Sequence, residues 1–367
     1  MTHITPSFNY RICSLAIAAF GFLWLAPPSV AQDAGWAYDV DVLVSDGSVP
    51  ANFTDPNLKN PWGLAFNPFA FDWVANNHTG TSTLYDGLGN AAPLVVKIPG
   101  VNGEEVGEPT GIVYSGGTDF VVTDGVKKGP ARFMFAGENG TITGWSPDVN
   151  LNEAIVAINH SGQHAVYLGL AIGGNGAGHR LYAANFHSNR VEMYDGNFQR
   201  IFSSGAFVDP SVPAGYGPFG IQNVGGDIVV AFAKHAPGED DEMAGKGLGI
   251  VDLFDADGRL ISRVASFGEL NAPWGIALAP RSFGRFGGAL LIGNFGDGTI
   301  NAYDMRSGTF LGKLRRPSGK AVRIDGLWGI AFGNGVLSQP TNTLYFAAGV
   351  KDENGGAYGA IKAHAAD

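Results

Sequence analysis

Short apolar stretches, separated by turns rich in Gly, Asn and Asp, follow one another along the chain and predict a succession of short β-strands. One phrase opens each group of strands: a turn or apolar residue, often proline, then usually an aromatic or leucine, a glycine and a short apolar run. Its six glycines are Gly63, Gly111, Gly169, Gly220, Gly275 and Gly329, spaced by 48, 58, 51, 55 and 54 residues. A repeat near this length with several strands in each copy is typical of a β-propeller. Six copies predict six blades.

The predicted strands group into blades over residues 60–98, 108–160, 165–204, 216–267, 271–315 and 325–364. In blade two, FVVTD at 120–124 is the expected second strand. The last blade lacks one strand, whereas residues 38–45 alternate polar and apolar positions and belong to no complete repeat. We therefore expect an all-β, six-bladed β-propeller in which this N-terminal strand completes the last blade, because such closure removes an exposed sheet edge.

The N-terminus reads as a targeting segment. Arg11 precedes the apolar run 12–26, and Ser29-Val30-Ala31 supplies small residues at a cleavage position. This pattern predicts a secretory signal peptide over 1–31, followed by a single propeller domain over 32–367. The expected location is therefore periplasmic or extracellular. The apolar run is too short for a membrane span and no later stretch reaches that length, and the one cysteine, Cys13, lies inside the predicted signal.

Composition narrows the class of partner. The chain has 55 glycines, 45% hydrophobic residues and a net charge of −10 from 33 acidic and 23 basic residues. The hydrophobic content allows a real core, so the glycines indicate turns and close backbone approaches. An acidic chain without a basic patch does not fit a nucleic-acid partner.

Polar side chains end the predicted second strands. In a four-stranded meander these ends share one rim with the starts of the first strands. We therefore expect Asn76, Asn77, Asp124, Asn185 and Asn294 around one mouth of the central tunnel. The alternative is that these residues only hydrogen-bond their own turns. Trp62, Trp274 and Trp328 precede phrase glycines and would either fill the gaps between blades or line that mouth, where they could bind a ligand.

The same rim should receive an acidic set and three histidines. The acids are Glu239, Asp240, Asp241, Glu242, Asp297, Asp352 and Glu353. Oxygen ligands without thiolates are what Ca²⁺ prefers, although a solvated acidic face is the alternative. His78, His187 and His235 follow second strands, and His78 and His187 with Asp241 are the candidate proton carriers. The motifs of common serine hydrolases and nucleotide-binding loops do not occur in the sequence.

Long runs of the chain resemble a family of secreted bacterial propeller-like proteins that often carry a C-terminal PEP-type sorting tail. The resemblance rests above all on LVSDGSVPANFTDPNLKNPWGLAFNP at 43–68 and PWGIALAPRSFGRFGGALLIGNFGDGTINAYD at 273–304. This chain ends at Asp367 without such a tail, so we expect a freely soluble product. The repeats are also loosely similar to NHL-type propellers and to six-bladed calcium-dependent lactonases. That resemblance implies Glu108, Asp124, Asn185 and Asn294 as Ca²⁺ ligands.

The leading expectation is an exported, monomeric propeller that binds a small molecule, a glycan or an extracellular protein at the tunnel rim. The alternative is a Ca²⁺-dependent hydrolase or lyase of the lactonase type, with its metal at the tunnel mouth. In that enzyme the metal would polarise a carbonyl group and stabilise the developing negative charge. The sequence leaves open whether the protein is an enzyme.

Overall fold

The computed structural model describes residues 1–3, 35–103 and 106–365. The chain divides into two units, Met1–Ala34 and Gly35–Asp367. Apart from its first three residues, the predicted signal peptide lies outside the described part. In the described residues of the second unit, β-strands are joined by turns and four 3₁₀ segments, with no α-helix. The 3₁₀ segments are η1 (Asn77–Thr79), η2 (Val101–Gly103), η3 (Ser161–Gln163) and η4 (Gly284–Phe286).

Six antiparallel sheets form the blades, each listed from its inner to its outer strand. Blade one is β3 (Pro61–Phe66), β4 (Asp72–Asn76), β5 (Thr81–Tyr85) and β6 (Val96–Lys97). Blade two is β7 (Pro109–Tyr114), β10 (Phe133–Gly137), β11 (Thr141–Trp145) and β12 (Ile155–Asn159). Blade three is β13 (Tyr167–Gly174), β14 (His179–Asn185), β15 (Arg190–Asp195) and β16 (Arg200–Ile201). Blade four is β17 (Tyr216–Val224), β18 (Asp227–Lys234), β19 (Ile250–Phe254) and β20 (Leu260–Ser266). Blade five is β21 (Pro273–Leu278), β22 (Leu290–Asn294), β23 (Ile300–Tyr303) and β24 (Phe310–Lys313).

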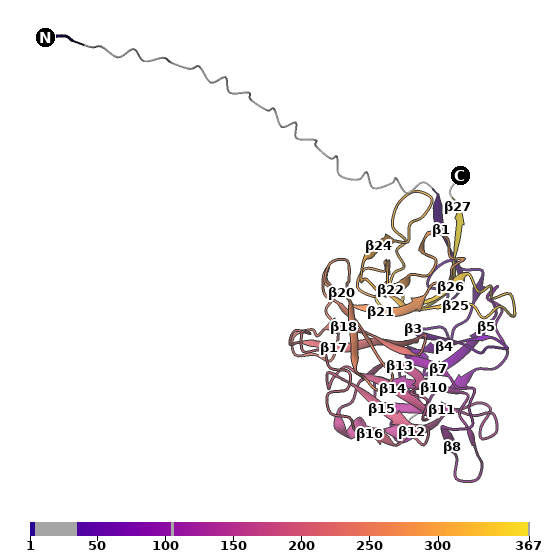
Figure 1. Cartoon of the computed structure of the whole chain (residues 1–367). Helices are drawn as coiled ribbons and strands as arrows, with labels where there is room; N and C mark the ends of the chain where they lie inside the picture. The colour runs from indigo at the N-terminus through magenta and orange to yellow at the C-terminus, as the bar shows by residue number, and fades with distance from the viewer. Residues whose placement is uncertain (4–34, 104–105, 366–367) are drawn as a thin grey trace. The chain divides into compact units, whose positions relative to one another are not determined.

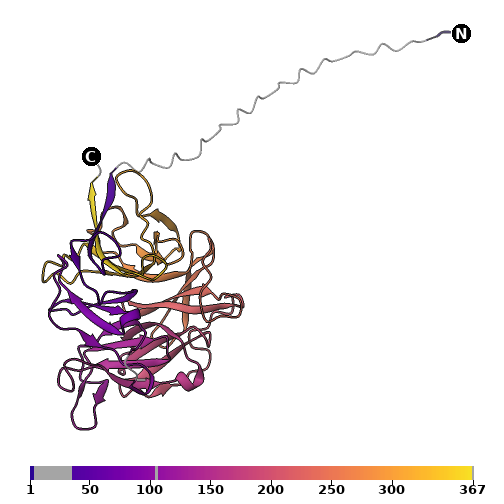
Figure 2. The same cartoon turned by 180° about the vertical axis from the view of Figure 1, so that it is seen from behind.

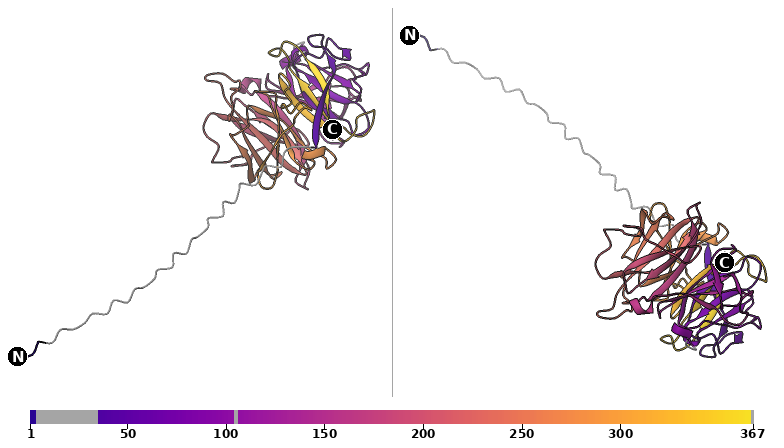
Figure 3. Two further views of the ribbon diagram at one scale, coloured as in Figure 1. Left: turned by 90° about the horizontal axis from the view of Figure 1, so that it is seen from above. Right: turned by 90° about the horizontal axis from the view of Figure 1, so that it is seen from below.

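Blade six confirms the predicted closure. Its strands are β25 (Leu327–Phe332), β26 (Thr343–Ala348), β27 (Ala357–Ala365) and the N-terminal β1 (Trp36–Ser45), and the short β2 (Phe53–Thr54) pairs in parallel with the outer edge of β1. The antiparallel ladder between β1 and β27 runs from Trp36 opposite Ala365 to Ser45 opposite Ala357. Figures 1 and 2 show these two strands side by side from opposite directions, and Figure 3 shows the propeller from above and from below. The all-β six-bladed propeller is therefore confirmed.

Blade two departs from the predicted strand assignment. Residues 120–124 do not supply its second strand; they lie in an added hairpin of β8 (Val121–Thr123) and β9 (Lys128–Pro130). The second strand is β10, which pairs with β7 on one side and β11 on the other. The pattern of FVVTD correctly predicted a strand, but it pairs locally across a tight turn in which the Asp124 carboxylate accepts hydrogen bonds from the N–H groups of Val126 and Lys127 at 2.8 and 2.7 Å.

The phrase glycines form a closed ring of backbone contacts between neighbouring inner strands. A methyl carbon built on Gly63 would lie 2.6 Å from the Thr110 carbonyl oxygen, and one on Gly275 would lie 2.6 Å from that of Trp328. The last contact closes the circle, because a methyl carbon on Gly329 would lie 2.5 Å from the Trp62 carbonyl oxygen in blade one. The phrase recurs because six inner strands approach too closely for a side chain at this position.

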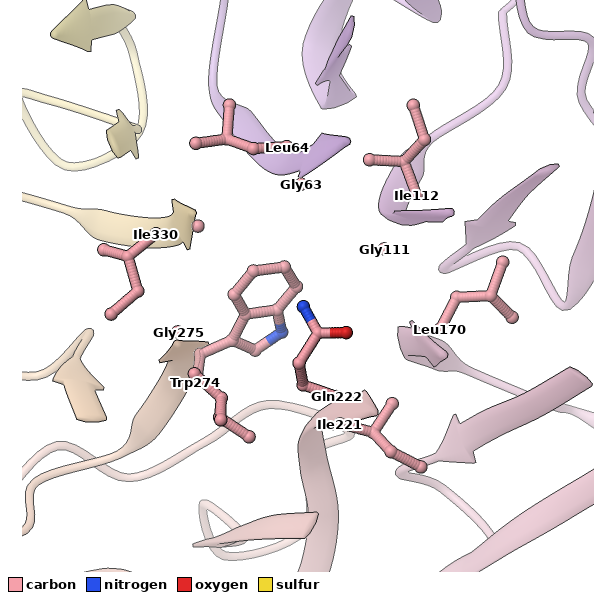
Figure 4. A pocket seen from close by; sticks show the side chains of 12 residues that line it. Gly63, Leu64, Gly111, Ile112, Leu170, Ile221, Gln222, Trp274, Gly275 and Ile330 are labelled. Carbon is pink, nitrogen blue, oxygen red and sulfur yellow. The ribbon is translucent and has the colours of Figure 1, made fainter. Parts of the chain in front are cut away.

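The residues before these glycines close one end of the tunnel. In most blades the ladder between the first two strands shifts register at this point, as between Pro273 and Gly275. The side chains of Trp62, Leu168, Phe219, Trp274 and Trp328 pack together in one buried cluster with Phe186 and Phe295. Below it, the channel narrows to a cavity of about 40 Å³, where Figure 4 shows Gln222 and Trp274 inside a ring of Leu64, Ile112, Leu170, Ile221 and Ile330. A space of this volume has room for a few waters but is too small for a substrate.

Candidate functional site

The predicted rim exists. The end of each second strand pairs with the start of the first: Asn76 with Pro61, Asn185 with Tyr167, and Asn294 with Pro273. The corresponding residue of blade two is Gly137, opposite Pro109, and Asp124 is not part of this set. The chain leaves β7 at its far end before entering the β8–β9 hairpin, so Asp124 belongs to the connection at the opposite end of blade two.

The rim asparagines point into the protein. Asn76, Asn185 and Asn294 are at most 1% exposed. Asn76 donates to Thr83 Oγ1 at 3.0 Å, Asn185 donates to Glu192 Oε1 at 3.1 Å, and Asn294 donates to the carbonyl of Glu269 at 2.8 Å. These bonds hold the strand ends to the neighbouring strands β5 and β15 and to the β20–β21 connection.

The three candidate tryptophans are also buried. Trp62 and Trp328 stack with their ring centroids 3.4 Å apart, and Trp274 meets each of them edge to face. Their exposed fractions are 3%, 1% and 8%. They therefore pack at the tunnel axis and not in the gaps between blades. A ligand above them would meet Phe295, whose ring is partly exposed and stacks on Trp328 at 4.0 Å.

An acidic cavity of about 510 Å³ opens at this rim, and we call it the mouth pocket. Its charged or titratable lining residues are His78, Asp241, Glu242, Asp325, Asp352 and Glu353, and Phe295 contributes its one aromatic side chain other than histidine. No lysine or arginine is among the described residues that line it. The acids come from the β18–β19, β24–β25 and β26–β27 connections, three loops separated in sequence.

Burial and mutual repulsion raise the pKa values of acids in and near this pocket. Burial, with the adjacent Asp241, raises the pKa of Glu242 to about 9. Burial also raises the pKa of Glu353, although Asn60 donates a 2.8 Å hydrogen bond to its carboxylate. Burial, with lesser contributions from Glu108, Glu353 and Asp241, raises the pKa of Glu138 to about 7. Glu138 accepts a 2.6 Å hydrogen bond from Asn77 Nδ2.

The candidate proton carriers are divided between two pockets. His78 and Asp241 line the mouth pocket, where burial and the positive charge of Lys59 lower the pKa of His78. His187 lines a neighbouring cavity of about 440 Å³, and its Nδ1 lies 2.7 Å from an Asp240 carboxylate oxygen. His235 lines the same cavity and stacks on Phe186 with ring centroids 3.9 Å apart. His187 therefore does not share a pocket with the other two candidates.

The residues implied as calcium ligands are not gathered at one point. Asp124 lies at the opposite end of blade two, Asn185 is bound to Glu192 within its own blade, and Asn294 is bound to the Glu269 carbonyl group in the β20–β21 connection. Glu108 lies at the start of blade two, near Glu138. In the described part of the chain, no group of three or more His, Asp or Glu side chains is arranged to hold a metal ion.

The sequence reasoning missed Glu138 and Phe295. The sequence could have placed Glu138 at the end of a second strand. The apolar run FMFAG at 133–137 is typical of a strand, and the Asn139-Gly140 pair that follows is typical of a hairpin turn. Phe295 follows Asn294 directly, but no sequence rule shows that its ring turns toward the axis. Of the predicted acidic set, Asp297 does not line the mouth pocket; it accepts a 2.7 Å hydrogen bond from Thr299 and pairs with Arg323.

Comparison with known proteins identifies relatives in a virus. Uncharacterized protein R648 of Acanthamoeba polyphaga mimivirus is 33% identical over 352 residues, which cover 94% of this chain and 85% of that protein. Uncharacterized protein L690 of the same virus is 31% identical over 334 residues, covering 88% and 85%. The chain belongs to the family of these proteins. No protein-family model matches it. These viral relatives do not support the expected bacterial origin or the sorting tail.

Solved structures share the fold at low identity. Virginiamycin B lyase from Staphylococcus aureus superposes with a TM-score of 0.52 at 11% identity, covering 89% of this chain and 99% of that one. The PQQ-bound aldose sugar dehydrogenase from Streptomyces coelicolor gives 0.53 at 14%, covering 91% and 100%. A Bacteroides thetaiotaomicron protein of unknown function gives 0.54 at 12%, covering 90% and 76%. These likenesses extend to the propeller fold alone. Among the described residues no helix is long and apolar enough to cross a membrane.

Proposed function

We propose that the protein is an exported binding propeller that takes a small organic cation, an ammonium compound, into the mouth pocket. The observation that carries this proposal is the lining of the pocket: five carboxyl groups, one histidine and one aromatic ring around about 510 Å³, with no lysine or arginine among the described lining residues. Export rests on the N-terminal sequence pattern, and mass spectrometry of the secreted protein would test it by showing an N-terminus at Gln32.

The charge of the pocket selects the sign of the ligand. An anion would face repulsion from several carboxylates, whereas an ammonium group gains about 1 kcal/mol from each carboxylate at 4 Å, even in water-like surroundings. An ammonium group near the Phe295 ring gains about 0.5–2 kcal/mol more. A cavity of this size suits a ligand larger than a bare ion. Among the described residues, no three His, Asp or Glu side chains are arranged to hold a metal ion, which favours this interpretation over the calcium-dependent hydrolase.

Binding should release protons. Glu242, which lines the pocket, carries a proton at pH 7 in the free protein, because burial raises its pKa to about 9. A bound cation favours the ionised carboxylate and so lowers this pKa. The affinity should therefore rise as pH increases from 6 to 9.

Isothermal titration calorimetry with spermidine, putrescine and choline tests the proposal, with 3,3-dimethyl-1-butanol, the uncharged isostere of choline, as the neutral comparison and Ca²⁺ as the metal arm. Asp352→Asn removes one pocket carboxylate and should weaken amine binding about fivefold. Glu239→Gln, on the same rim but lining the neighbouring cavity, is the matched control and should leave the affinity unchanged. Absence of binding by all three amines, or equal affinity in Asp352→Asn, would refute an amine site.

A further inference from the structure

A second cavity lies at the opposite rim, between blades two and three, and we call it the far-rim pocket. It has a volume of about 440 Å³ and is lined by Tyr114, Ser115, Gly116, Gly117, Ile172, Gly173 and His179. Tyr114 ends β7, whereas His179 begins β14, so the two blades provide its two sides. Its volume falls in the range of small-molecule sites.

A histidine is held in a fixed orientation at this pocket. His179 Nδ1 lies 2.7 Å from Asp119 Oδ2, and Asp119 comes from the connection that follows β7. Gly117 packs against the pair so closely that a methyl carbon there would lie 3.3 Å from the imidazole Nδ1 and would overlap the Asp119 carboxylate. The His179 side chain is 56% exposed, and its Nε2 has no hydrogen-bond partner in the described part of the chain. One ring nitrogen is therefore anchored and the other is available to a ligand.

A buried hydroxyl group lines the same pocket without a partner. Ser115 is 2% exposed, and its Oγ makes no hydrogen bond within the described residues. The second oxygen of Asp119, Oδ1, is likewise buried without a partner. Unpartnered buried polar atoms are uncommon because each costs free energy that a bound group can return. The unpartnered Ser115 Oγ therefore indicates a site for a ligand that supplies a hydrogen-bonding group.

The chemistry of the lining indicates which ligand fits. Among the described lining residues there is no lysine or arginine. The Asp119 carboxylate is already bound to the imidazole, and the Arg132 guanidinium beside the pocket donates a 3.0 Å hydrogen bond to the Gly117 carbonyl oxygen. A hydroxyl, a phenol and an imidazole nitrogen remain, and these both donate and accept hydrogen bonds as hydroxyl groups do. Tyr114 and Ile172 are partly exposed and offer apolar surface for C–H groups.

We propose that the far-rim pocket is a second ligand site, separate from the mouth pocket, which binds a small uncharged polyol or sugar through His179 Nε2 and Ser115 Oγ. The two rims then select different chemistries. The mouth pocket, lined by carboxyl groups, takes a cation, and the far-rim pocket takes a neutral molecule rich in hydroxyl groups. This proposal does not depend on the amine site.

The test follows the imidazole Cε1–H NMR signals of histidine-labelled protein during titration with glucose, N-acetylglucosamine and sorbitol. Ligand concentrations up to about 100 mM allow dissociation constants in the millimolar range to be measured. We expect one signal to shift with saturation and to disappear in His179→Gln. His187→Gln, at the other rim, is the matched control and should leave that shift in place.

Ser115→Ala separates binding from structure. Because Oγ has no hydrogen-bond partner among the described residues, its removal should leave the urea midpoint unchanged or higher. It should also weaken polyol binding about two- to tenfold, the contribution of one hydrogen bond. Absence of a saturating His179 shift with all three probes would overturn the proposal, and so would an affinity that Ser115→Ala leaves unchanged. A normal spermidine titration in Ser115→Ala would show that the mouth pocket is intact.

Discussion

The ring of glycine contacts makes a quantitative prediction, which we develop for Gly275→Ala. A methyl carbon on Gly275 would lie 2.6 Å from the Trp328 carbonyl oxygen, whereas ordinary contact begins at 3.4 Å. The inner strands of blades five and six must therefore separate by about 0.8 Å, which is 3.4 − 2.6 Å. The opposing atom belongs to the backbone of β25 in the neighbouring blade, so no side-chain rotation relieves the overlap.

The expected cost follows from two opposing effects. Forcing an additional carbon into a packed interior typically costs about 1–3 kcal/mol. Replacing glycine by alanine also restricts the unfolded chain, which stabilises the folded protein by about 0.4–1 kcal/mol where the site has room. We therefore expect Gly275→Ala to lower the free energy of unfolding by about 1–2 kcal/mol. Gly220→Ala should cost more, because its methyl carbon would overlap the Trp274 carbonyl oxygen outright.

Reversible urea unfolding, followed by tryptophan fluorescence, measures these differences. Gly169→Ala is the graded comparison, since its methyl carbon would lie 2.9 Å from the Phe219 carbonyl oxygen and should cost less. Gly162→Ala is the control, because this exposed position has no atom within 4 Å of the new carbon. The order of stability should be 162, 169, 275, 220, from highest to lowest. If Gly220→Ala and Gly162→Ala unfold at the same urea concentration, the inner strands do not pack as described.

Four further changes test other parts of the structure. Deletion of residues 36–45 removes β1 and exposes the edge of β27, so light scattering should show aggregation. Burial raises the pKa of Asp72 well above its usual range, so stability is lost as pH rises from about 4 through that raised pKa. Asp72→Asn should abolish this loss in urea titrations from pH 4 to 8. An unchanged pH profile in the variant would contradict the burial of an ionisable Asp72. Arg263 pairs with Asp209 at 2.5 Å and with the buried Asp252. Arg263→Met should therefore lower the free energy of unfolding by about 3–5 kcal/mol, because it leaves a buried carboxylate without its cation. Adding Asp252→Asn to this variant should restore part of that free energy in a double-mutant cycle. Glu242→Gln should raise the urea midpoint at pH 9 or above and weaken spermidine binding there, because burial keeps its carboxyl group protonated up to about pH 9.

The architecture could be predicted because one geometric demand recurs in every blade. The close approach of inner strands requires a glycine, so Gly63 and its five counterparts mark the blades directly in the sequence. The missing strand of blade six and the spare strand at 38–45 likewise predicted the closure that the β1–β27 ladder confirms. Both inferences depend on backbone packing, which requires the same residue types at the same position of each repeat.

The candidate site could be predicted only in part, because it depends on loops that do not repeat. The strand pattern of residues 120–124 cannot show whether they pair with the blade or with their own hairpin, and Asp124 was misplaced for that reason. Asn185 was correctly placed at the rim, but its burial against Glu192 follows from neighbours that only the fold brings together. The raised pKa of Glu138 results chiefly from its burial, with smaller contributions from Glu353 and Asp241 on other blades, and none of these is visible in its local sequence.

The stability cost of the mouth pocket is itself an argument for binding. Carboxyl groups whose pKa values are raised by burial, such as Glu242 and Glu353, lose favourable hydration on folding and gain no ion pair with a described residue in return. Stability alone would favour amides or apolar side chains at these positions. By contrast, the buried Glu192 of blade three is bound by Arg190, Arg200 and two tyrosines, and its pKa falls to about 2. The same protein therefore contains a fully paired buried carboxylate and an acidic group without ion pairs around a cavity, and this contrast supports the proposal that the mouth pocket binds a positively charged ligand.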